Sequence, residues 1–459
     1  MIEKFLILIF TVFISSQGLI HSQQKNWSLE ECIKYAIDNN LQIKQQVIQT
    51  EYQKNTLDLS KLNLLPTLNA SASQNYSFRR TLDQLTYQYS NKNGISNNFY
   101  VGGSLNLFNG LQNFNTIKKN QYLLLASEQD LQNIKDNIAL TIAMDYLQIL
   151  LNKELVAVTD NQLQITLQQI EKTKKMVNAG SLARGNLLQI ESQAATEEVQ
   201  YINQKNLLDI SFLNLTQLLE LKTPVGFEVV VPEISIDTNN IIIGNIDEIF
   251  SVAETSRPEV KSSELKLTAS EYNLKVAKGS RSPYITMNHT FTTGYYNTTS
   301  KILGYDPTTQ TPITGEYPFS QQISDNINYG LGFTMNIPIL NGWQINKNIA
   351  NSKLNIQSSK YTLEGTKKQL YKNIQQAYTD AVAALKKYNA SIKAVSASEE
   401  SFRYTEQKFN IGMVTPVDYN AGKTQLLNAQ SDMSQAKYDY IFKTKVLDFY
   451  KGIPITLNK

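Results

Sequence analysis

The chain has 459 residues, a formal net charge of +3, one cysteine and two histidines. That length is sufficient for two or three ordinary globular domains. Acidic and basic residues are interleaved, and no basic cluster of the kind that binds nucleic acid stands out, so the composition argues against a nucleic-acid partner.

The first 22 residues have the pattern of a signal peptide. Lys4 supplies positive charge, residues 5–14 form a short apolar core, and residues 15–22 offer small and polar cleavage positions. The apolar core is about half as long as a membrane-spanning helix. Because no later apolar run is long enough either, we expect any membrane insertion of the mature chain to use strands.

The first helix is expected to begin at Ser28, where Ser28 and Glu31 form the pattern of a capping box, and to run to about Leu62. Cys32 lies on this helix, and we interpret it as a small apolar core residue. As the single cysteine, it has no partner for an intramolecular disulfide.

The chain contains an internal repeat. Asn-Gly pairs occur at 109–110 and 341–342, and the glycines of the sequences at 177–180 and 409–412 have the same separation of 232 residues (342 − 110 and 412 − 180). A looser match relates residues 64–68 to residues 281–285, at an offset of 217 (281 − 64). Each half is therefore expected to contain a helix, two strands and a long helical hairpin.

The repeat suggests how the chain is divided. We expect these segments: a signal peptide at 1–22, a first repeat at 23–221, an equatorial linker at 222–245, a second repeat at 246–452 and a C-terminal tail at 453–459.

Four strands are expected, at about 66–76, 98–108, 283–294 and 326–340. The last alternates large apolar residues with small or polar ones most clearly. A length of about ten residues suits a tilted transmembrane strand with one face toward lipid and the other toward water. Aromatic residues near the strand ends are predicted to form interfacial belts. They are Tyr76, Phe78, Tyr100, Tyr284, Tyr295, Tyr296 and Tyr329.

The loops at 79–98 and 295–325 are polar, which suits the exterior side of an outer-membrane barrel. The long helices follow the strands. Residues 111–176 contain neither Pro nor Gly, and residues 343–410 contain one glycine. A helix of about 65 residues is about 100 Å long and needs lateral helical partners.

Four strands are too few to close a barrel, and open sheet edges are not tolerated in lipid. Either the strands pair in a soluble sheet or several chains pool them. Three chains would supply twelve strands and a hollow cylinder of helices, which together would form a conduit.

The order of motifs resembles one family. The sequences at 27–41, 409–419, 426–430, 436–440 and 447–452 resemble those of TolC-like outer-membrane factors, also called outer membrane efflux proteins, of the type found in Bacteroidetes. The resemblance covers almost all of the mature chain.

The resemblance implies a mainly α fold with a transmembrane β part, assembled as a homotrimer with a twelve-stranded barrel, a helical periplasmic tunnel and an equatorial belt. It implies an outer-membrane duct of a tripartite efflux or type I secretion system. The partners would be outer-membrane lipid, a periplasmic adaptor and an inner-membrane pump of the RND or ABC type. The family has no catalytic residue, metal site or cofactor, and the cargo is not readable from this chain.

Two turns are candidate docking sites for the adaptor. Each glycine is expected to end a long helix in the left-handed conformation, with apolar residues exposed beside it. The docking residues would be Gly180, Ser181, Leu182 and Ala183 in the first turn and Gly412, Met413, Val414 and Thr415 in the second.

The resemblance also places a pore gate at these tips. Asp418 matches an acidic ring at the tunnel entrance, although an alternative role is to favour the start of a helix. Phe409, Val414 and Asn186 stand where the best-known gate has a tyrosine, an arginine and an aspartate, and Ala421 replaces a second ring aspartate. We therefore expect closure by packing and neutral hydrogen bonds, with a weak acidic ring.

Two other classes of protein are alternatives. An enzyme is disfavoured because His289 is the single histidine that follows the expected leader. In addition, the sequence has none of the known motifs for phosphate binding, metal binding or a catalytic nucleophile. A periplasmic coiled-coil scaffold or adaptor would explain the helices but not the four alternating strands.

Overall fold

The computed structural model describes residues 26–82, 89–232 and 245–457. The expected signal peptide and part of the expected linker at 222–245 lie outside the described residues. The chain divides into two compact units. One contains residues 1–49, 128–261 and 364–459, and the other contains residues 50–127 and 262–363.

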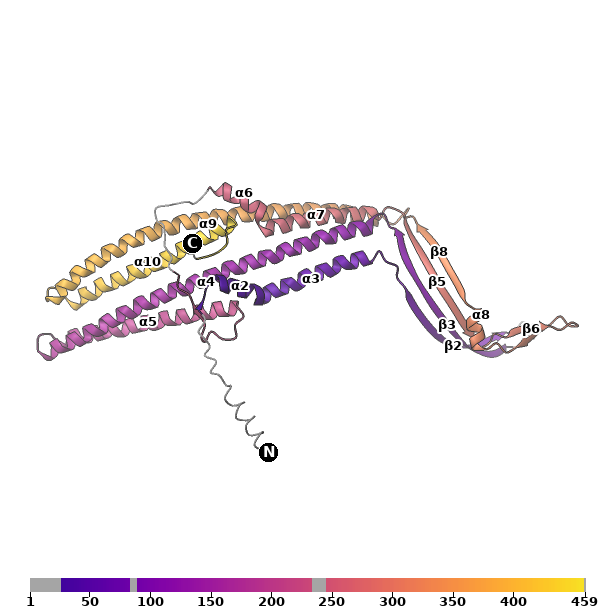
Figure 1. Ribbon diagram of the computed structural model, residues 1–459, viewed down its shortest axis with the longest axis horizontal. Helices are drawn as coiled ribbons and strands as arrows, with labels where there is room; N and C mark the ends of the chain where they lie inside the picture. The colour runs from indigo at the N-terminus through magenta and orange to yellow at the C-terminus, as the bar shows by residue number, and fades with distance from the viewer. Residues whose placement is uncertain (1–25, 83–88, 233–244, 458–459) are drawn as a thin grey trace, which may run out of the picture. The chain divides into compact units, whose positions relative to one another are not determined.

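Helices dominate the chain, and Figure 1 labels the larger elements. The helices are α2 (Leu29–Asn39), α3 (Leu41–Leu62), α4 (Gln112–Asn178), α5 (Arg184–Leu218), α6 (Ile246–Ser256), α7 (Pro258–Gly279), α8 (Phe319–Asp325), α9 (Gln344–Asn410) and α10 (Pro416–Tyr450). The strands are β1 (Asn26–Trp27), β2 (Asn69–Leu82), β3 (Tyr89–Phe108), β4 (Glu228–Val229), β5 (Tyr284–Tyr296), β6 (Lys301–Tyr305), β7 (Pro312–Gly315) and β8 (Asn328–Asn336). Within the described ranges, no helix is both long and apolar enough to cross a membrane.

The helices repeat with the offsets found in the sequence. α2 and α3 recur as α6 and α7 after 217 residues (246 − 29 and 258 − 41), and α4 and α5 recur as α9 and α10 after 232 (344 − 112 and 416 − 184). α4 and α9 each have 67 residues, and α5 and α10 each have 35. At 1.5 Å per residue, the longer helices extend about 100 Å.

The first helix is not continuous, contrary to the expectation from its sequence. It breaks at Asn40, whose backbone is extended (φ −61°, ψ 133°). The Asn40 side-chain oxygen accepts the Gln42 amide at 2.9 Å, and its amide group donates to the Leu218 carbonyl at 3.0 Å. Asn40 thus ends α2, caps α3 and attaches both to α5, a role that local sequence patterns do not reveal.

The apolar core of the first unit forms around α2, α4 and the end of α5. Tyr146 is 1% exposed and donates its hydroxyl to the Val230 carbonyl at 2.6 Å, beside the short parallel pair of β1 and β4. Burial raises the pKa of the Tyr146 hydroxyl above its ordinary value, and the nearby acidic groups add to the shift. Cys32 is fully buried in this core, which confirms its interpretation as a small apolar residue.

The second unit holds an antiparallel sheet in the order β2-β3-β5-β8. β2 and β3 stay in register from Asn69↔Gly102 to Leu82↔Tyr89. The hairpin therefore continues through much of the segment 79–98 that the sequence suggested was a loop. β2 and β8 are the two edges of this sheet.

The register gives the sheet two different faces. Residues paired directly across antiparallel strands point to the same side. One side, here called the apolar face, carries Phe99, Val101 and Leu105 of β3, Met287 and Phe291 of β5, and Tyr329, Leu331, Phe333 and Met335 of β8. The other, here called the polar face, carries Ser71 and Ser73 of β2, Asn98 and Ser104 of β3, Asn288, Thr290 and Thr292 of β5, and Thr334 of β8.

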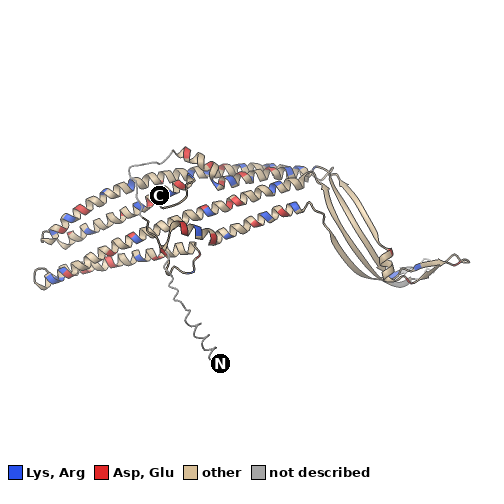
Figure 2. Cartoon of the chain, viewed as in Figure 1, with Lys and Arg blue, Asp and Glu red and all other residues tan. Residues whose placement is uncertain are grey.

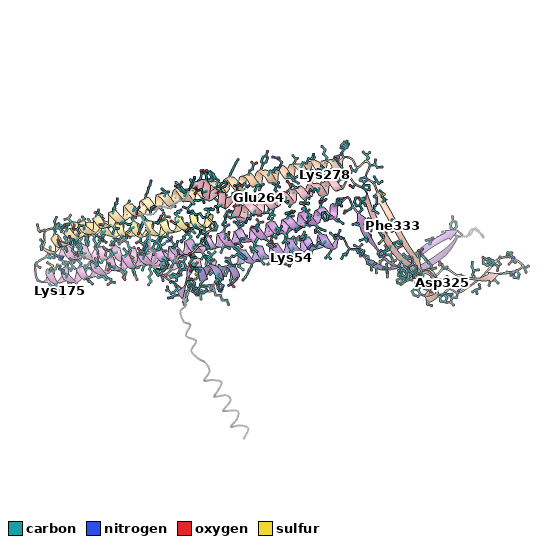
Figure 3. The ribbon with its side chains drawn as sticks, turned by 45° about the horizontal axis from the view of Figure 1, so that its top comes forward. Lys54, Lys175, Glu264, Lys278, Asp325 and Phe333 are labelled. Carbon is teal, nitrogen blue, oxygen red and sulfur yellow. The ribbon has the colours of Figure 1, made fainter. Side chains whose placement is uncertain are left out.

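The β8 side chains of the apolar face are strongly exposed in the single chain, as Phe333, 65% exposed and labelled in Figure 3, illustrates, whereas those of β3 and β5 are half-buried. Figure 2 shows charged residues along the helices, whereas the four long strands have almost none over most of their length. The register also divides the residues expected to form aromatic belts. Tyr76, Phe78, Tyr295 and Tyr329 lie on the apolar face, but Tyr100, Tyr284 and Tyr296 lie on the polar face.

Candidate functional site

The candidate site is formed by the ends of two helical hairpins, α4–α5 and α9–α10, in the first unit. Gly180 and Gly412 have φ values of 75° and 76°, so both helices end in the left-handed conformation expected from the sequence. The Ser181 amide donates to the Met176 carbonyl at 3.0 Å, and the Met413 amide donates to the Lys408 carbonyl at 2.8 Å. These bonds satisfy carbonyl groups that the ending helices leave free.

The second tip is the more apolar at its surface. Ile411 and Met413 are 71% and 70% exposed, while Val414 is half-buried. In the first tip Ser181 and Ala183 are exposed and Leu182 is half-buried. The sequence therefore identified Met413 as an exposed apolar residue, was wrong about the exposure of Leu182 and Val414, and missed Ile411.

Asp418 lies in the first turn of α10 and takes part in a capping box. Its carboxylate accepts the Thr415 amide at 3.2 Å and the Thr415 hydroxyl at 2.7 Å, and its own amide donates to the Thr415 hydroxyl oxygen at 3.2 Å. The side chain is exposed. The helix-starting role weighed for Asp418 is thus present in the single chain.

Phe409 packs against Tyr419 rather than standing alone at the tip. The two ring centroids are 4.6 Å apart, and the ring centroid of Phe402 lies 5.2 Å from that of Tyr419. Tyr419 is 4% exposed; burial, followed by the nearby Glu406 and Glu197 carboxylates, raises its pKa to about 12. Asn186, on the other hairpin, donates its backbone amide to the Ala183 carbonyl at 3.0 Å.

One turn above Tyr419, a buried ion pair joins the two hairpins. Lys423 of α10 and Glu197 of α5 are each 2% exposed, and the ammonium nitrogen lies 3.5 Å from both carboxylate oxygens. Lys423 also donates to the Gln162 carbonyl of α4 at 2.9 Å and to the Thr166 hydroxyl. Gln193 donates to Glu197 at 2.9 Å. We call Lys423, Glu197, Thr166, Gln162 and Gln193 the hairpin clamp.

The clamp keeps two charges out of water by giving both of them partners. Burial lowers the pKa of Lys423 below its ordinary value, while the Glu197 carboxylate opposes that shift. An ion pair in such a place adds little net stability compared with well-packed apolar side chains, but loss of one partner is costly. The clamp therefore favours one alignment of the hairpins.

A second contact between the hairpins lies farther along α10. Glu154 of α4 accepts the Ser434 hydroxyl at 2.6 Å and the Lys437 ammonium at 3.0 Å. Burial raises the pKa of the Glu154 carboxyl, but these hydrogen bonds and the charge of Lys437 outweigh it and hold the pKa below its ordinary value. In both contacts the first hairpin supplies the carboxylate and the second supplies the ammonium.

A shallow groove of about 540 Å³ lies between α5 and α10 beside the clamp. Its lining is neutral and mostly amide or hydroxyl: Gln193, Val417, Asn420, Ala421, Thr424, Gln425 and Asn428. Ala421, which stands where the resemblance places a second ring aspartate, is part of this uncharged lining.

The chain was compared with known proteins. The family model of the outer membrane efflux proteins matches residues 32–220 and 249–448, which together make up most of the chain. The chain belongs to this family. It is therefore an efflux protein of the outer membrane, as the sequence motifs had suggested.

Solved structures share the fold of this efflux protein at low sequence identity. The CmeC outer membrane channel of Campylobacter jejuni gives a TM-score of 0.76 at 16% identity, over 96% of this chain and 92% of that one. The outer membrane protein VceC of Vibrio cholerae gives 0.74 at 14%, over 92% and 96%. The open state of the MtrE outer membrane channel of Neisseria gonorrhoeae gives 0.69 at 16%, over 95% and 92%. No curated protein matches the chain by sequence.

Sequence reasoning missed the hairpin clamp of the efflux protein, although a signal was present. Lys423 follows Tyr419 and precedes Leu427 at intervals of four, and Glu197 follows Ala194 in the buried stripe of α5. Two opposite charges inside apolar stripes indicate a buried pair. Because Lys423 and Glu197 are 226 residues apart, the sequence does not show that they pair with each other.

His289 lies on the apolar face of the sheet, paired with Gly103 and Leu331. Within the part of the chain that the structure describes, no group of three His, Cys, Asp or Glu side chains is placed to hold a metal ion.

Proposed function

We propose that this protein is the outer-membrane duct of a tripartite efflux or type I secretion system, and that it works as a homotrimer. The observation that carries the proposal is the four-stranded sheet, which has an apolar face, a polar face and two edge strands, β2 and β8. Four strands do not close, and open edges are excluded from lipid. Three copies that pair β8 of one with β2 of the next give twelve strands, a number within the range of membrane barrels.

The duct would be passive, a conduit rather than an enzyme. A periplasmic adaptor would bind the hairpin tips, and an inner-membrane pump of the RND or ABC type would supply the energy. The exposed Ile411 and Met413 support docking at the second tip, because apolar side chains at a helix turn gain most by being covered.

The gate would depend on how the hairpins are held. We place Asp418 in a weak acidic ring formed by three copies, with Phe409, Val414 and Asn186 around it. The neutral lining of the groove beside Ala421 supports a ring of low charge. The hairpin clamp would keep the two hairpins of each copy aligned when the tips separate.

Neighbouring residues on opposite faces of β8 provide the main test. Phe333→Lys places a charge on the face proposed to meet lipid and is expected to cost about 2–4 kcal/mol near the middle of the bilayer. Thr334→Lys places the same charge on the proposed lumen face. We expect the first variant to lose heat-modifiable trimers from the outer membrane, and the second to assemble and change single-channel conductance.

A soluble periplasmic scaffold would give another pattern. If wild-type protein leaves the membrane without detergent and both lysine variants accumulate equally as monomers, the duct proposal is wrong.

The acidic ring has its own test in planar bilayers. Asp418→Asn removes the charge but keeps an oxygen that accepts the Thr415 amide, whereas Asp418→Ala removes both. If the ring acts through charge, both variants weaken block by divalent cations to the same extent. Unchanged block in Asp418→Asn would exclude the ring.

A further inference from the structure

The short helix α8 occupies an unusual place at the edge of the sheet. The pairing of β5 with β8 stops at Thr292↔Asn328, although β5 continues to Tyr296. Beyond that point, side chains of α8 and the residue after it take the place of a strand. The Tyr296 amide donates to Gln322 at 3.0 Å, and Gln322 donates back to the Tyr296 carbonyl at 3.1 Å.

This replacement gives hydrogen-bond partners to the backbone amide and carbonyl groups at the end of β5. Asn326 adds a bond to the Gly294 carbonyl at 2.8 Å, and Gln322 is 1% exposed. Unpaired backbone groups are costly in lipid and less so in water. The hydrogen bonds of Gln322 and Asn326 to β5 therefore suit an edge that lies in an environment poor in water.

α8 lies on the apolar face. The Phe319 ring is 5.1 Å from Tyr295 and 6.4 Å from Phe99, and the Thr293 hydroxyl donates to the Ile323 carbonyl at 2.6 Å. Phe99 pairs directly with Thr293, so all three sheet residues share the side that carries Phe333. Figure 3 labels Asp325 at the end of α8 and Phe333 on β8.

The position along β5 sets the depth of α8. Ile285 and Tyr295 are ten residues apart (295 − 285). With a rise of about 3.3 Å per residue and a tilt of about 40°, they are separated by about 25 Å along the membrane normal. That equals the height of the lipid-facing band of such barrels. With Ile285 placed at the opposite end of the band, the cluster of Phe99, Tyr295 and Phe319 lies at the end where aromatic residues are enriched.

The helix itself has two sides. Phe319 is 47% exposed although it packs on two aromatic rings, and Ile327, just beyond the helix, is 39% exposed. Ser320, Ser324 and Asp325 are exposed on the remaining surface, and Asp325 accepts the Tyr317 hydroxyl at 3.1 Å. An apolar side continuous with the sheet face and a polar side opposite suit a helix lying in the plane of a membrane interface.

We infer that α8 is an interfacial helix whose partner is the lipid surface. It lies in the headgroup layer at the loop end of the barrel, with Phe319 among the first carbons of the acyl chains and Ser324 toward water. The inference rests on the proposed function, because it requires the sheet to span the membrane.

Single tryptophans test the depth. In a protein with Trp27→Phe and Trp343→Phe, one tryptophan is introduced by Phe319→Trp, Phe333→Trp or Thr334→Trp. The trimer is reconstituted in phosphatidylcholine brominated either near the headgroup or near the chain ends. We expect the shallow bromines to quench most of the Phe319→Trp emission, the deep bromines to quench Phe333→Trp, and neither to quench Thr334→Trp.

Each outcome bears on one claim. If water-soluble iodide quenches Phe319→Trp while brominated lipid does not, or if the deep bromines quench it best, the inference about α8 is wrong but the duct proposal stands. If neither lipid quenches Phe333→Trp, the sheet does not face lipid and the proposed function fails.

A second probe covers the case in which Phe319→Trp does not assemble. Ser324→Cys in a Cys32→Ser protein is labelled with a nitroxide, and its collision rates with oxygen and with a polar nickel complex give its depth. A depth at the headgroups supports the inference, and free exposure to the nickel complex alone overturns it.

Discussion

The two helical hairpins have the same lengths but begin and pack differently. α5 starts after Ala183 without a side-chain cap, whereas α10 starts with Thr415, Pro416 and a full capping box. The positions equivalent to Tyr419 and Lys423, 232 residues earlier, are Leu187 and Glu191, and Glu191 is exposed. The repeat thus preserves the backbone, while the side chains give each hairpin its own part in the two ion pairs: the first supplies the acids and the second supplies the lysines.

The largest expected effect comes from breaking the hairpin clamp. Lys423→Met leaves the Glu197 carboxylate buried without its ion pair, which is expected to cost about 3–5 kcal/mol. Lys423→Met with Glu197→Leu removes both charges and is expected to restore most of that loss. The measurement is the loss of helical circular dichroism on heating the trimer in detergent.

Lys437→Met is the matched control. Its ion pair with Glu154 is partly exposed, because 27% of the Lys437 side chain and 29% of the Glu154 side chain are accessible to solvent. Loss of this pair is therefore expected to cost about 1 kcal/mol or less. A double variant no more stable than Lys423→Met alone would show that the clamp is not an energetic unit.

The turn glycines test whether the two turns, which have the same backbone conformation, lose the same stability when the glycine is replaced. Gly180→Ala and Gly412→Ala each force a side chain into the left-handed region, at an expected cost of about 1–2 kcal/mol. An added Cβ meets no atom within 4 Å at either site, so the two losses should match. Gly365→Ala, in the interior of α9 and also in open space, is the control and should stabilise the helix by about 0.5–1 kcal/mol. Unequal losses, measured by thermal unfolding, would contradict the equivalence of the turns.

The caps test where the hairpins differ. Thr415→Ala removes the capping hydroxyl of α10 and is expected to cost about 1 kcal/mol, whereas Ala183→Ser adds a cap to α5 and is expected to gain a similar amount or less. Hydrogen exchange at the amides of Asp418 and Asn186 reports each first turn separately. Faster exchange at Asp418 after Thr415→Ala, with Asn186 unchanged, is the expected result. Equal changes at both amides would mean that the tips unfold together.

The smallest effect is a pH dependence at Glu154. Because the folded pKa of this carboxyl is depressed, its contribution is complete above its ordinary value of 4.5 and is lost as the pH falls through the folded value. The side chain is 29% exposed, so we expect about 1 kcal/mol or less. Glu154→Gln should flatten this part of the stability profile measured by denaturant unfolding. An unchanged profile would assign the acid sensitivity to other carboxylates.

Local chemistry predicted the long helices and the four strands of the main sheet, but it was wrong about the segment 295–325, which was expected to be a loop and contains β6, β7 and α8. Absence of proline and glycine predicted the long helices, alternation predicted the strands of the sheet, and Gly180 and Gly412 predicted the turns. The same reasoning gave the start of a helix as one of two roles for Asp418, and the capping box of α10 shows that role. It did not predict that Asn40 interrupts the first helix, because the Leu218 carbonyl that holds Asn40 lies 178 residues away.

The sequence alone therefore determined the repeat and the types of the main elements, because these follow from patterns within a few turns of chain or from a fixed offset, and the family entered through the resemblance of its motifs. Only the tertiary structure decided that Lys423 meets Glu197, that α8 replaces a strand at the edge of β5, and which tyrosines share the apolar face. Those facts depend on contacts between distant segments and on strand register, where a shift of one residue moves every side chain to the opposite face.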